Sequence, residues 1–253
     1  SMHGQTGNLQ FQGITQANVQ GFFDEINEQG WDLGGAGPTM RTASACVGPA
    51  RCEQACYDTL GLHTKIMKHF VDYVHRPEFP YKIKMKFSGC ANDCVNSIQR
   101  SDIAFIGTWR DSIQIDQNEV KAFVKLKGRK EVIDDVVKRC PTNAISLNDD
   151  DTLAIENSDC VRCMHCINVM TKALSPGKDH LKVGNMLGSV LIPFVKATTE
   201  DEMNKVIEFL QSIIDWWSES ALDHERMGET IERIGMPQFL EELGIEASPD
   251  MVN

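Results

Sequence analysis

Cysteine spacing constrains the fold of this chain more than any other feature. Cys160, Cys163 and Cys166 form a C-x2-C-x2-C run, and a separate Cys140 is followed by proline. Bacterial iron–sulfur proteins use C-x2-C-x2-C-x3-C-P, in which the last cysteine binds a different cluster from the first three. Met170 stands at that last position here, so Cys140 is expected to complete the set. The sequence therefore predicts one [4Fe-4S] cluster held by these four cysteines.

A zinc site is the alternative for this run, with His165 of CMHC as a possible ligand. Zinc sites usually consist of two separated C-x2-C pairs, whereas three cysteines on one tight loop suit a cubane. We therefore favour an iron–sulfur site and expect His165 to fill space beside it.

The remaining cysteines form two pairs and one residue left over. Cys46 and Cys52 make C-x5-C. Cys90 and Cys94 make C-x3-C, and Cys56 is unassigned. The total of nine is odd, and in a reducing compartment such residues are more often ligands or catalytic groups than disulfides. Spacing alone leaves a zinc site, a set of buried thiols and a second cluster open for the pairs.

A lysine at every second position marks the segment KIKMKF, directly before the C-x3-C pair. Side chains alternate faces along a strand, so the lysines would share one face, about 7 Å apart, and the apolar residues would face the core. Like charges so placed repel, and we expect an anion or water opposite them. The lysines are Lys82, Lys84 and Lys86, and the apolar residues are Ile83, Met85 and Phe87.

Charge and hydropathy argue against two classes of partner. A net charge of −11 disfavours nucleic-acid binding, which usually needs an excess of lysine and arginine on one face. No stretch reaches the roughly 18 uninterrupted apolar residues of a membrane helix, and SMHGQTGNLQ lacks the parts of a signal peptide. We expect a cytoplasmic protein without membrane insertion. Its start at Ser1, in sequence typical of a domain interior, is characteristic of a fragment.

The apolar pattern predicts both helices and strands. QANVQGFFDEINEQG predicts a helix, and GGAGPTM a glycine-rich connection, because it lacks the lysine and hydroxyl of a phosphate-binding loop. Strands are expected at YKIKMKFS, SDIAFIGT and SIQID. Residues 130–174 are predicted to form a small unit with a short helix, the Cys-Pro, a hairpin around NDDD, the cysteine run and another short helix.

A long helix is predicted after Thr199. This residue as N-cap and Glu202 three residues later form a capping box. Apolar residues at helical spacing then predict one buried stripe, which we interpret as core and not as a cofactor site. The stripe consists of Met203, Val206, Ile207, Leu210, Ile213, Ile214 and Trp217.

Two segments together resemble the signature of siroheme-containing sulfite and nitrite reductases, namely RTASACVGPARC and KIKMKFSGCANDC. The resemblance implies that the two cysteine pairs bind a second [4Fe-4S] cluster and that Cys94 also bridges to the siroheme iron. Cys56 would then be a spare buried thiol on the helix that includes CEQACYDTL. The ligands implied for this cluster are Cys46, Cys52, Cys90 and Cys94.

The resemblance extends over nearly the whole chain to the alpha subunits of dissimilatory sulfite reductases. It is carried by HGQTGN, RTASACVGPARCEQACYD, HRPEFPYKIKMKFSGCANDC, SDIAFIGTW, CVRCMHCINVMTKAL, VGNMLGSVLIPF and ERMGETIERIG. It implies the six-electron reduction of sulfite toward sulfide at a siroheme–[4Fe-4S] centre, with electrons entering through the ferredoxin-type cluster. Assimilatory sulfite reductases and siroheme nitrite reductases are the alternatives, and they lack the inserted ferredoxin-like unit.

The same resemblance implies an α+β fold and the order of its domains. A sulfite reductase domain would span 1–127 and 181–240, interrupted by a ferredoxin-like [4Fe-4S] domain at 128–180 and followed by a tail at 241–253. The family's amino-terminal part, which supplies the other half of the siroheme pocket and a further anion-binding arginine, would be missing.

The family's sulfite pocket implies roles for several cations. The family's K-x-K pair matches Lys82 and Lys84, and the arginine before the first cysteine matches Arg41. Lys86 is an additional charge whose role is open, and we group it with the other three as candidate catalytic residues. Arg51 is expected either to pair with a siroheme carboxylate or to face solvent.

The partners implied are a beta subunit in an alpha2-beta2 heterotetramer, a small sulfur-carrier protein of the gamma or C type, and an electron donor. A function of a different class is also open. The chain would then be a structural or electron-relay subunit whose own porphyrin site is silent or carries metal-free sirohydrochlorin.

Overall fold

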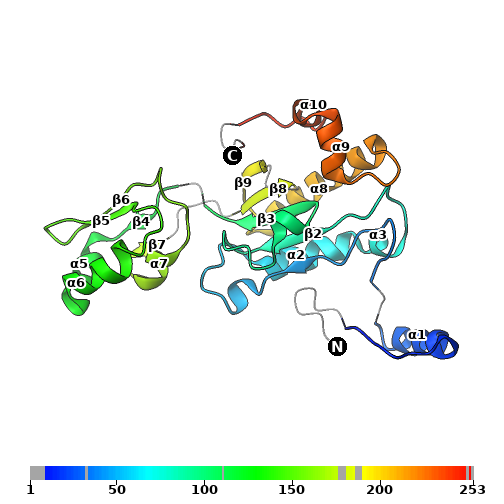
Figure 1. Ribbon diagram of the computed structural model, residues 1–253, viewed down its shortest axis with the longest axis horizontal. Coiled ribbons are helices and arrows are strands. Elements are labelled where there is room, and N and C mark those ends of the chain that lie inside the picture. Colours follow the sequence, from blue (N-terminus) through cyan, green and yellow to red (C-terminus); the bar gives the residue numbers. More distant parts are fainter. Residues whose placement is uncertain are drawn as a thin grey trace.

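The chain folds into two units with separate hydrophobic cores (Figure 1). The structure is a computed structural model that describes residues 9–31, 34–109, 111–175, 181–185, 190–248 and 251. The segment HGQTGN and the middle of VGNMLGSVLIPF lie outside these residues. A mixed sheet with surrounding helices forms the larger unit, and two antiparallel strand pairs with short helices form the smaller one, drawn in green in Figure 1.

The helices and strands have the following bounds. The α-helices are α1 Val19–Glu28, α2 Thr59–His69, α3 Val71–His75, α4 Ser97–Arg100, α5 Gln117–Lys127, α6 Arg129–Val132, α7 His165–Val169, α8 Glu200–Ser220, α9 Met227–Ile234 and α10 Met236–Glu242. The strands are β1 Ser44–Ala45, β2 Met85–Ser88, β3 Ile103–Gly107, β4 Gln114–Ile115, β5 Ile145–Leu147, β6 Leu153–Ile155, β7 Leu174–Ser175, β8 Leu181–Asn185 and β9 Val190–Val195. Turns of 3-10 helix cover Gln16–Asn18 and Gly48–Ala50, and a π-helical turn covers Ile133–Val137.

The sheet of the larger unit has the strand order β1-β2-β3-β8-β9. Strands β1, β2 and β3 run parallel, whereas β8 is antiparallel to β3 and β9 is antiparallel to β8. The carboxyl ends of the three parallel strands therefore meet at one edge, which is where ligands usually bind in open sheets of this kind. The cysteine pairs follow β1 and β2, so the topology brings them to this edge.

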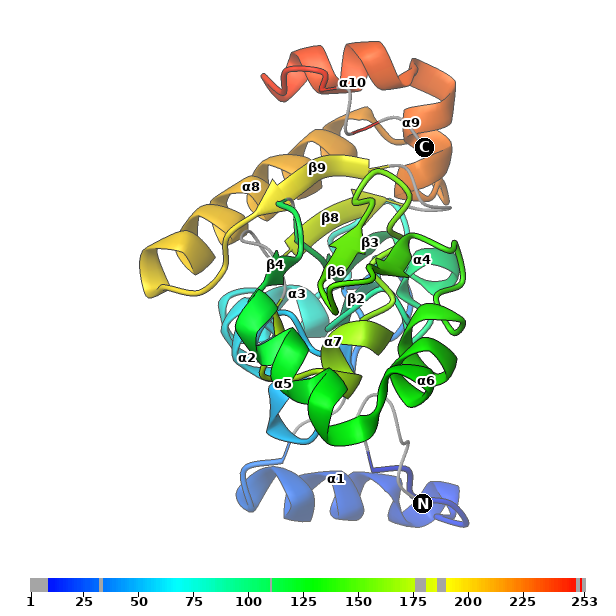
Figure 2. The same ribbon diagram turned by 90° about the vertical axis from the view of Figure 1, so that its left-hand side faces the viewer.

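One face of this sheet is covered by α2 and α8. Phe87 of β2 and Phe105 of β3 stand in register, and their rings stack with centroids 4.5 Å apart. The rings of His63, on α2, and Phe87 stand perpendicular to each other with centroids 5.6 Å apart. Trp217 of α8 is fully buried in the same core, and Figure 2 shows α8 running alongside β9. Lys84 and Lys86 alternate with the buried residues of the segment KIKMKF and point to the opposite face of the sheet.

The lysine segment is extended as expected, but its regular ladder is shorter than predicted. Hydrogen bonding of β2 begins at Met85, and Ile83 forms only an isolated bridge to Met40. The next pair after this bridge is Ser44–Lys86. The segment from Met40 to Ser44 is one residue longer than the segment from Ile83 to Lys86, so the ladder is interrupted as at a bulge. The alternation itself is confirmed, because the apolar residues are buried and the lysines are half-buried. The exposed fractions of Ile83, Met85 and Phe87 are 0%, 1% and 0%.

Most other predicted elements are present. The segment 16–30 contains a 3-10 turn and α1, SDIAFIGT contains β3, and SIQID contains β4. The glycine-rich connection has no helix or strand over residues 34–39. Together with the mixed sheet, these helices confirm the α+β class.

The smaller unit has a core that begins before the predicted start of the insert. This core includes Trp109, as well as Val120 and Val124 of α5, together with residues up to Leu174. A boundary at residue 128 would separate α5 from the residues that bury its apolar face. The division into domains remains a prediction, and we propose to begin the inserted unit near residue 109.

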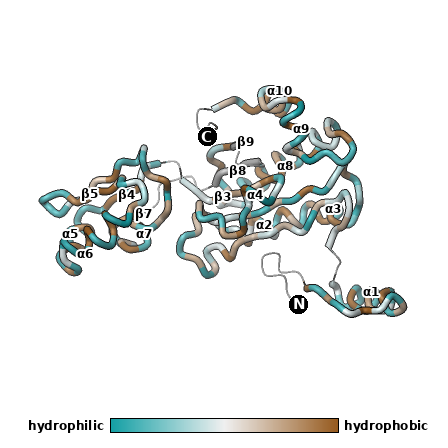
Figure 3. The backbone as a smooth tube through the Cα atoms, viewed as in Figure 1, coloured by the Kyte–Doolittle hydropathy of each residue, from teal (hydrophilic) through white to brown (hydrophobic). Residues whose placement is uncertain are grey.

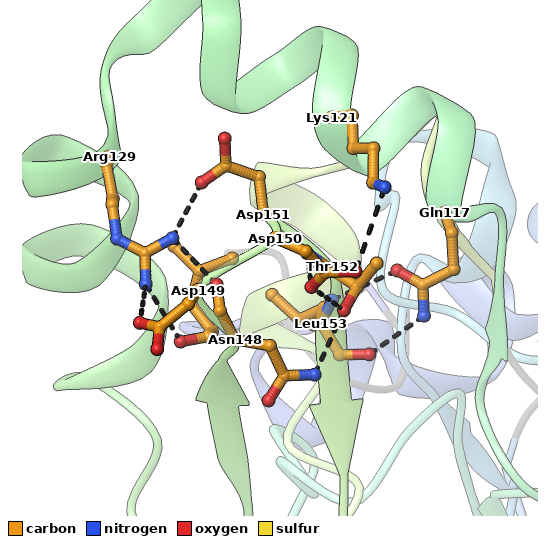
Figure 4. A network of polar contacts seen from close by, with 10 residues as sticks. Gln117, Lys121, Arg129, Asn148, Asp149, Asp150, Asp151, Thr152 and Leu153 are labelled. Carbon is orange, nitrogen blue, oxygen red and sulfur yellow. Dashed lines mark hydrogen bonds and ion pairs between the residues drawn. The ribbon is translucent and has the colours of Figure 1, made fainter.

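A polar network holds the β5–β6 hairpin of the smaller unit against α5 and α6 (Figure 4). Arg129 donates hydrogen bonds to the Asn148 carbonyl oxygen and to Asp151 at 2.7 Å and 2.6 Å. The Gln117 side chain donates to the carbonyl oxygen of Leu153 at 2.9 Å and accepts from its amide at 3.0 Å. The acidic NDDD turn is thereby used in fixing the hairpin.

Helix α8 confirms both predictions made for it. The hydroxyl of Thr199 accepts a hydrogen bond from the backbone N–H of Glu202, and the Glu202 carboxylate accepts from the backbone N–H of Thr199. The apolar stripe is buried in the main core, with Met203 partly buried at its beginning.

Replacing Thr199 by alanine should lower the free energy of unfolding by about 1 kcal/mol, because it removes an N-cap oxygen. Urea denaturation of the variant would measure the loss. Thr198→Ala is the matched control, since the hydroxyl of Thr198 accepts no capping hydrogen bond in the described residues. Equal losses in the two variants would contradict a capping role.

The hydropathy of the helices bears on whether any of them could span a membrane. Figure 3 shows hydrophilic and hydrophobic residues interspersed along the helices of both units. In the part of the chain that the structure describes, no helix is both long and apolar enough to cross a bilayer.

Candidate metal centres and anion site

The four cysteines of the ferredoxin-like motif line one cavity in the smaller unit. Cys140 approaches it from the segment after the π-helical turn, and the other three come from the loop before α7 and the start of that helix. Trp109 lines the same cavity. The structure thus brings together the residues that spacing grouped, and it does so around a common space. They are Cys140, Cys160, Cys163 and Cys166.

The backbone around this cavity explains how a short run can direct three cysteines inward. Arg162 and Met164 have positive φ angles of 57° and 67°, so the chain turns sharply between the cysteines. The Sγ of Cys140 accepts a hydrogen bond from the Ala144 amide at 3.3 Å. Burial alone would raise the pKa of the Cys140 thiol, but hydrogen bonds from Thr142 and its neighbours outweigh this effect and lower the pKa. The lower pKa favours the thiolate that a metal requires.

His165 lines the same cavity, but its ring is held by the backbone. Its Nε2 lies 2.7 Å from the carbonyl oxygen of Asp135, in the π-helical turn. Among the described residues, no three Cys, His, Asp or Glu side chains converge as ligands of a single ion. Each cysteine of a cubane binds a different iron, so the cluster reading does not require such convergence. The position of His165 supports its predicted role as a neighbour of the site.

The second set of cysteines lies at the carboxyl edge of the parallel strands. Cys46 follows β1 and Cys90 follows β2 after one glycine. The backbone N–H of Gly89 donates to the Sγ of Cys46 at 3.1 Å, which joins the two pairs. Burial raises the pKa of Cys90, and the nearby Cys94 and Cys52 thiols contribute a smaller rise. All four sulfurs therefore belong to one neighbourhood, and Cys94 is the exposed member.

Asp93 shapes the loop between Cys90 and Cys94, and sequence reasoning missed it. Its Oδ1 accepts hydrogen bonds from the Ser97 amide at 2.7 Å and from the Ser88 hydroxyl at 2.5 Å. Although burial opposes the change, these hydrogen bonds lower the pKa of the Asp93 carboxyl. Asp93 itself has a positive φ of 43°, which permits the tight turn. An aspartate inside a C-x3-C pair, with one serine before the pair and one after it, was the available signal.

Cys56 is not on a helix, which corrects the prediction. Asp58 accepts a hydrogen bond from the Gly61 amide at 3.0 Å as N-cap, so α2 begins at Thr59. Cys56 lies in the turn before this cap and is partly buried. Burial, with a smaller contribution from Cys90, raises the pKa of its thiol to about 12.

Arg41, Lys82 and Lys84 lie on the half-buried face of the lysine segment. The Arg41 amide donates to the Ile83 carbonyl oxygen at 2.9 Å, which places Arg41 beside the lysines. Its guanidinium also donates to the Thr39 hydroxyl at 2.9 Å. Burial lowers the pKa of Lys84, and the charges of Lys82 and Arg41 add to this effect. The structure therefore groups three of the predicted anion-binding cations.

Lys86 and Arg51 differ from that group. The Nζ of Lys86 donates to the Val95 carbonyl oxygen at 2.7 Å, directly after Cys94 in the chain. This contact ties the lysine face to the cysteine loop and uses one of the three donors of the ammonium group. Arg51 is exposed at the end of the 3-10 turn Gly48–Ala50, consistent with either of its two predicted environments.

A short segment connects the two cysteine sets. Gly107, at the end of β3, packs so closely on the backbone of Gly89 and Cys90 that a Cβ would not fit. Two residues later, Trp109 lines the cavity of the smaller unit. Cys56 also bridges the units, because its amide donates to the Gly89 carbonyl oxygen at 2.7 Å and its side chain packs on the smaller core.

Comparisons with known proteins agree with this arrangement. Residues 36–250 match the family model of the nitrite and sulphite reductase 4Fe-4S domain. The dissimilatory-type sulfite reductase alpha subunit of Allochromatium vinosum is 54% identical over 264 residues, which cover 100% of this chain and 63% of the relative. That of Megalodesulfovibrio gigas is 36% identical over 169 residues, which cover 57% of this chain and 84% of the relative.

A solved structure gives the same result. The crystal structure of dissimilatory sulfite reductase I superposes with a TM-score of 0.78 at 39% sequence identity, covering 94% of this chain and 60% of that one. The chain spans about 63% of the length of the relative from Allochromatium vinosum. It belongs to the nitrite and sulphite reductase 4Fe-4S domain family and, within that family, to the alpha subunits of the dissimilatory-type sulfite reductases.

Proposed function

We propose that this chain provides the alpha-subunit site at which sulfite is reduced by six electrons toward sulfide. The observation that carries the proposal is the common location of the cationic face and the second cysteine set. Lys86 contacts Val95, next to Cys94, and Ser88 contacts Asp93 inside the same loop. An anion held by the lysines would therefore lie beside the exposed Cys94.

The donor sets fit two [4Fe-4S] clusters and a siroheme. We assign Cys140, Cys160, Cys163 and Cys166 to a ferredoxin-type cluster, and Cys46, Cys52, Cys90 and Cys94 to a second cluster. Cys94 would also hold the siroheme iron, and the exposed Arg51 would pair with a siroheme carboxylate. When bound, these groups supply the electron-transfer and redox chemistry.

The protein's own contribution is charge and protons at the substrate. Arg41, Lys82 and Lys84 would neutralise bound sulfite and the negative charge that builds on its oxygens. The lowered pKa of Lys84 makes its ammonium a better proton donor near neutral pH. We propose that these residues bind sulfite and pass protons to the departing oxygens.

The assembly is proposed from the names of the relatives. Proteins named subunit alpha imply a beta partner, and we propose an alpha2-beta2 complex. A small sulfur-carrier protein and an electron donor would complete the system, with the complex in the cytoplasm.

A second candidate function is electron relay without turnover. It is favoured by the close packing of Gly107 on Cys90 and by Trp109 in the cavity, because this connection between the cysteine sets does not depend on the anion face. The metal content of the porphyrin separates the two functions. A metal-free ring in the alpha subunit of the intact complex, shown by visible absorption, would favour relay.

Iron and acid-labile sulfide should each approach about eight per alpha chain in the reconstituted complex, from two four-iron clusters. Siroheme iron, where present, adds about one more iron atom without sulfide. Cys163→Ala should reduce sulfide to about four by removing only the ferredoxin-type site. A wild-type value near four would eliminate one of the two assigned sites.

A further inference from the structure

Arg226 brings a further cation to the lysine face from a distant part of the sequence. It directly precedes α9, and its guanidinium donates from Nε to Oδ1 and from Nη2 to Oδ2 of Asp102, each at 2.8 Å. Paired bonds of this kind are the strongest arginine–carboxylate geometry. The side chain of Asp102 is 1% exposed and that of Arg226 is 24% exposed, so the guanidinium lies on the solvent side of the pair.

Asp102 also holds the backbone of Lys84. Its Oδ2 accepts a hydrogen bond from the Lys84 amide at 2.8 Å. In return, the Lys84 carbonyl oxygen accepts from the amides of Asp102 and Ile103 at 2.8 Å and 3.1 Å. The buried carboxylate of Asp102 thus connects the backbone of Lys84 with the guanidinium of Arg226.

The charge of Arg226 acts on the same region as the predicted anion-binding residues. After burial, Arg226 is the strongest influence that lowers the pKa of Lys84, ahead of Lys82 and Arg41. A guanidinium has five N–H donors in a planar fork. Contacts with Asp102 use Nε and Nη2, and in the described part of the chain Nη1 has no hydrogen-bond partner.

We propose that Arg226 is a fourth cationic member of the anion-binding face, with Asp102 as the positioning residue that keeps Arg226 and Lys84 together. The inference rests on the proposed function, because it assigns a residue to the same sulfite site. Asp102 binds one edge of the guanidinium and leaves the Nη1 side to donate to an oxyanion. The segment after α8 therefore contributes directly to a site whose other cations lie within the first half of the chain.

The test uses the full-length alpha chain in its complex with the beta partner. In Asp102→Asn/Arg226→Gln, two amides replace the ion pair, so no buried charge is left unpaired. We expect the sulfite dissociation constant, from optical titration of the holoenzyme, to rise about tenfold or more with iron content unchanged. Amide hydrogen exchange at Lys84 should accelerate. Arg226→Lys should show a rise of a few-fold, because the charge remains and the paired geometry is lost.

Lys84→Ala, measured in parallel, distinguishes an error in the role of Arg226 from an error in the anion-binding face as a whole. If it weakens sulfite binding while the double variant binds normally, Arg226 is not part of the face and the inference is overturned, although the proposed function stands. If neither variant changes binding, the anion face itself is wrong. Should the double variant lose iron, Arg226→Lys decides, and an unaltered dissociation constant overturns the proposal.

Discussion

Replacing Lys84 by alanine should lower kcat/KM for sulfite by about 100-fold, the usual effect of removing one donor to a developing oxyanion. Lys84 is half-buried and adjoins three other cations, so several positive charges act together on an anion at this face. Steady-state kinetics of the intact complex with sulfite and a reduced dye would measure the change. Both kcat and kcat/KM should fall, because the lysine stabilises charge that appears during reduction.

The control for this experiment is a lysine remote from the sheet edge. Lys121→Ala removes an exposed ammonium on α5, whose contact is a surface ion pair of 3.8 Å with Asp150. It should leave sulfite kinetics unchanged. Normal reduction by Lys84→Ala would show that the anion face is misassigned or that catalysis occurs in the partner subunit.

Local sequence patterns predicted much of this site because they depend on spacing within a single segment. The cysteine run, the alternation of lysine with buried apolar residues and the capping box of α8 each follow from a few neighbouring residues. The positions of several helices and strands follow from the same patterns, whereas the fold class was implied by the resemblance to a family. Such features can be read before the chain is folded.

Contacts between distant segments could not be read in this way. Arg226 and Asp102 are 124 positions apart, and no periodicity connects them. The role of Lys86 was open because its alternation predicts a face, whereas only the fold reveals that its ammonium binds Val95. The proposed start of the smaller unit near residue 109 depends equally on which core buries α5.

One local signal was available and was overlooked. The segment CEQACYDTL predicts a helix that includes Cys56, although Asp58 is a strong N-cap and α2 starts at Thr59, three residues beyond Cys56. The consequence is functional, because a cysteine in a turn beside Cys90 can be confused with a ligand. An experiment can distinguish the spare thiol from the true ligands.

Cys94→Ala should remove about four sulfides per chain from the second site, whereas Cys56→Ala should retain the full number. The two cysteines make a matched pair, since they lie in neighbouring loops and neither is in a helix or strand. Cys56 is partly buried in the turn before α2, and the resemblance leaves it outside both ligand sets. Cys94 is exposed beside the lysine face, so the proposed ligand shared with siroheme would be reachable there. Sulfide analysis and the visible spectrum would check both variants. Loss of sulfide from Cys56→Ala with retention in Cys94→Ala would exchange the roles of the two cysteines. The proposed porphyrin site would then lie away from the lysines.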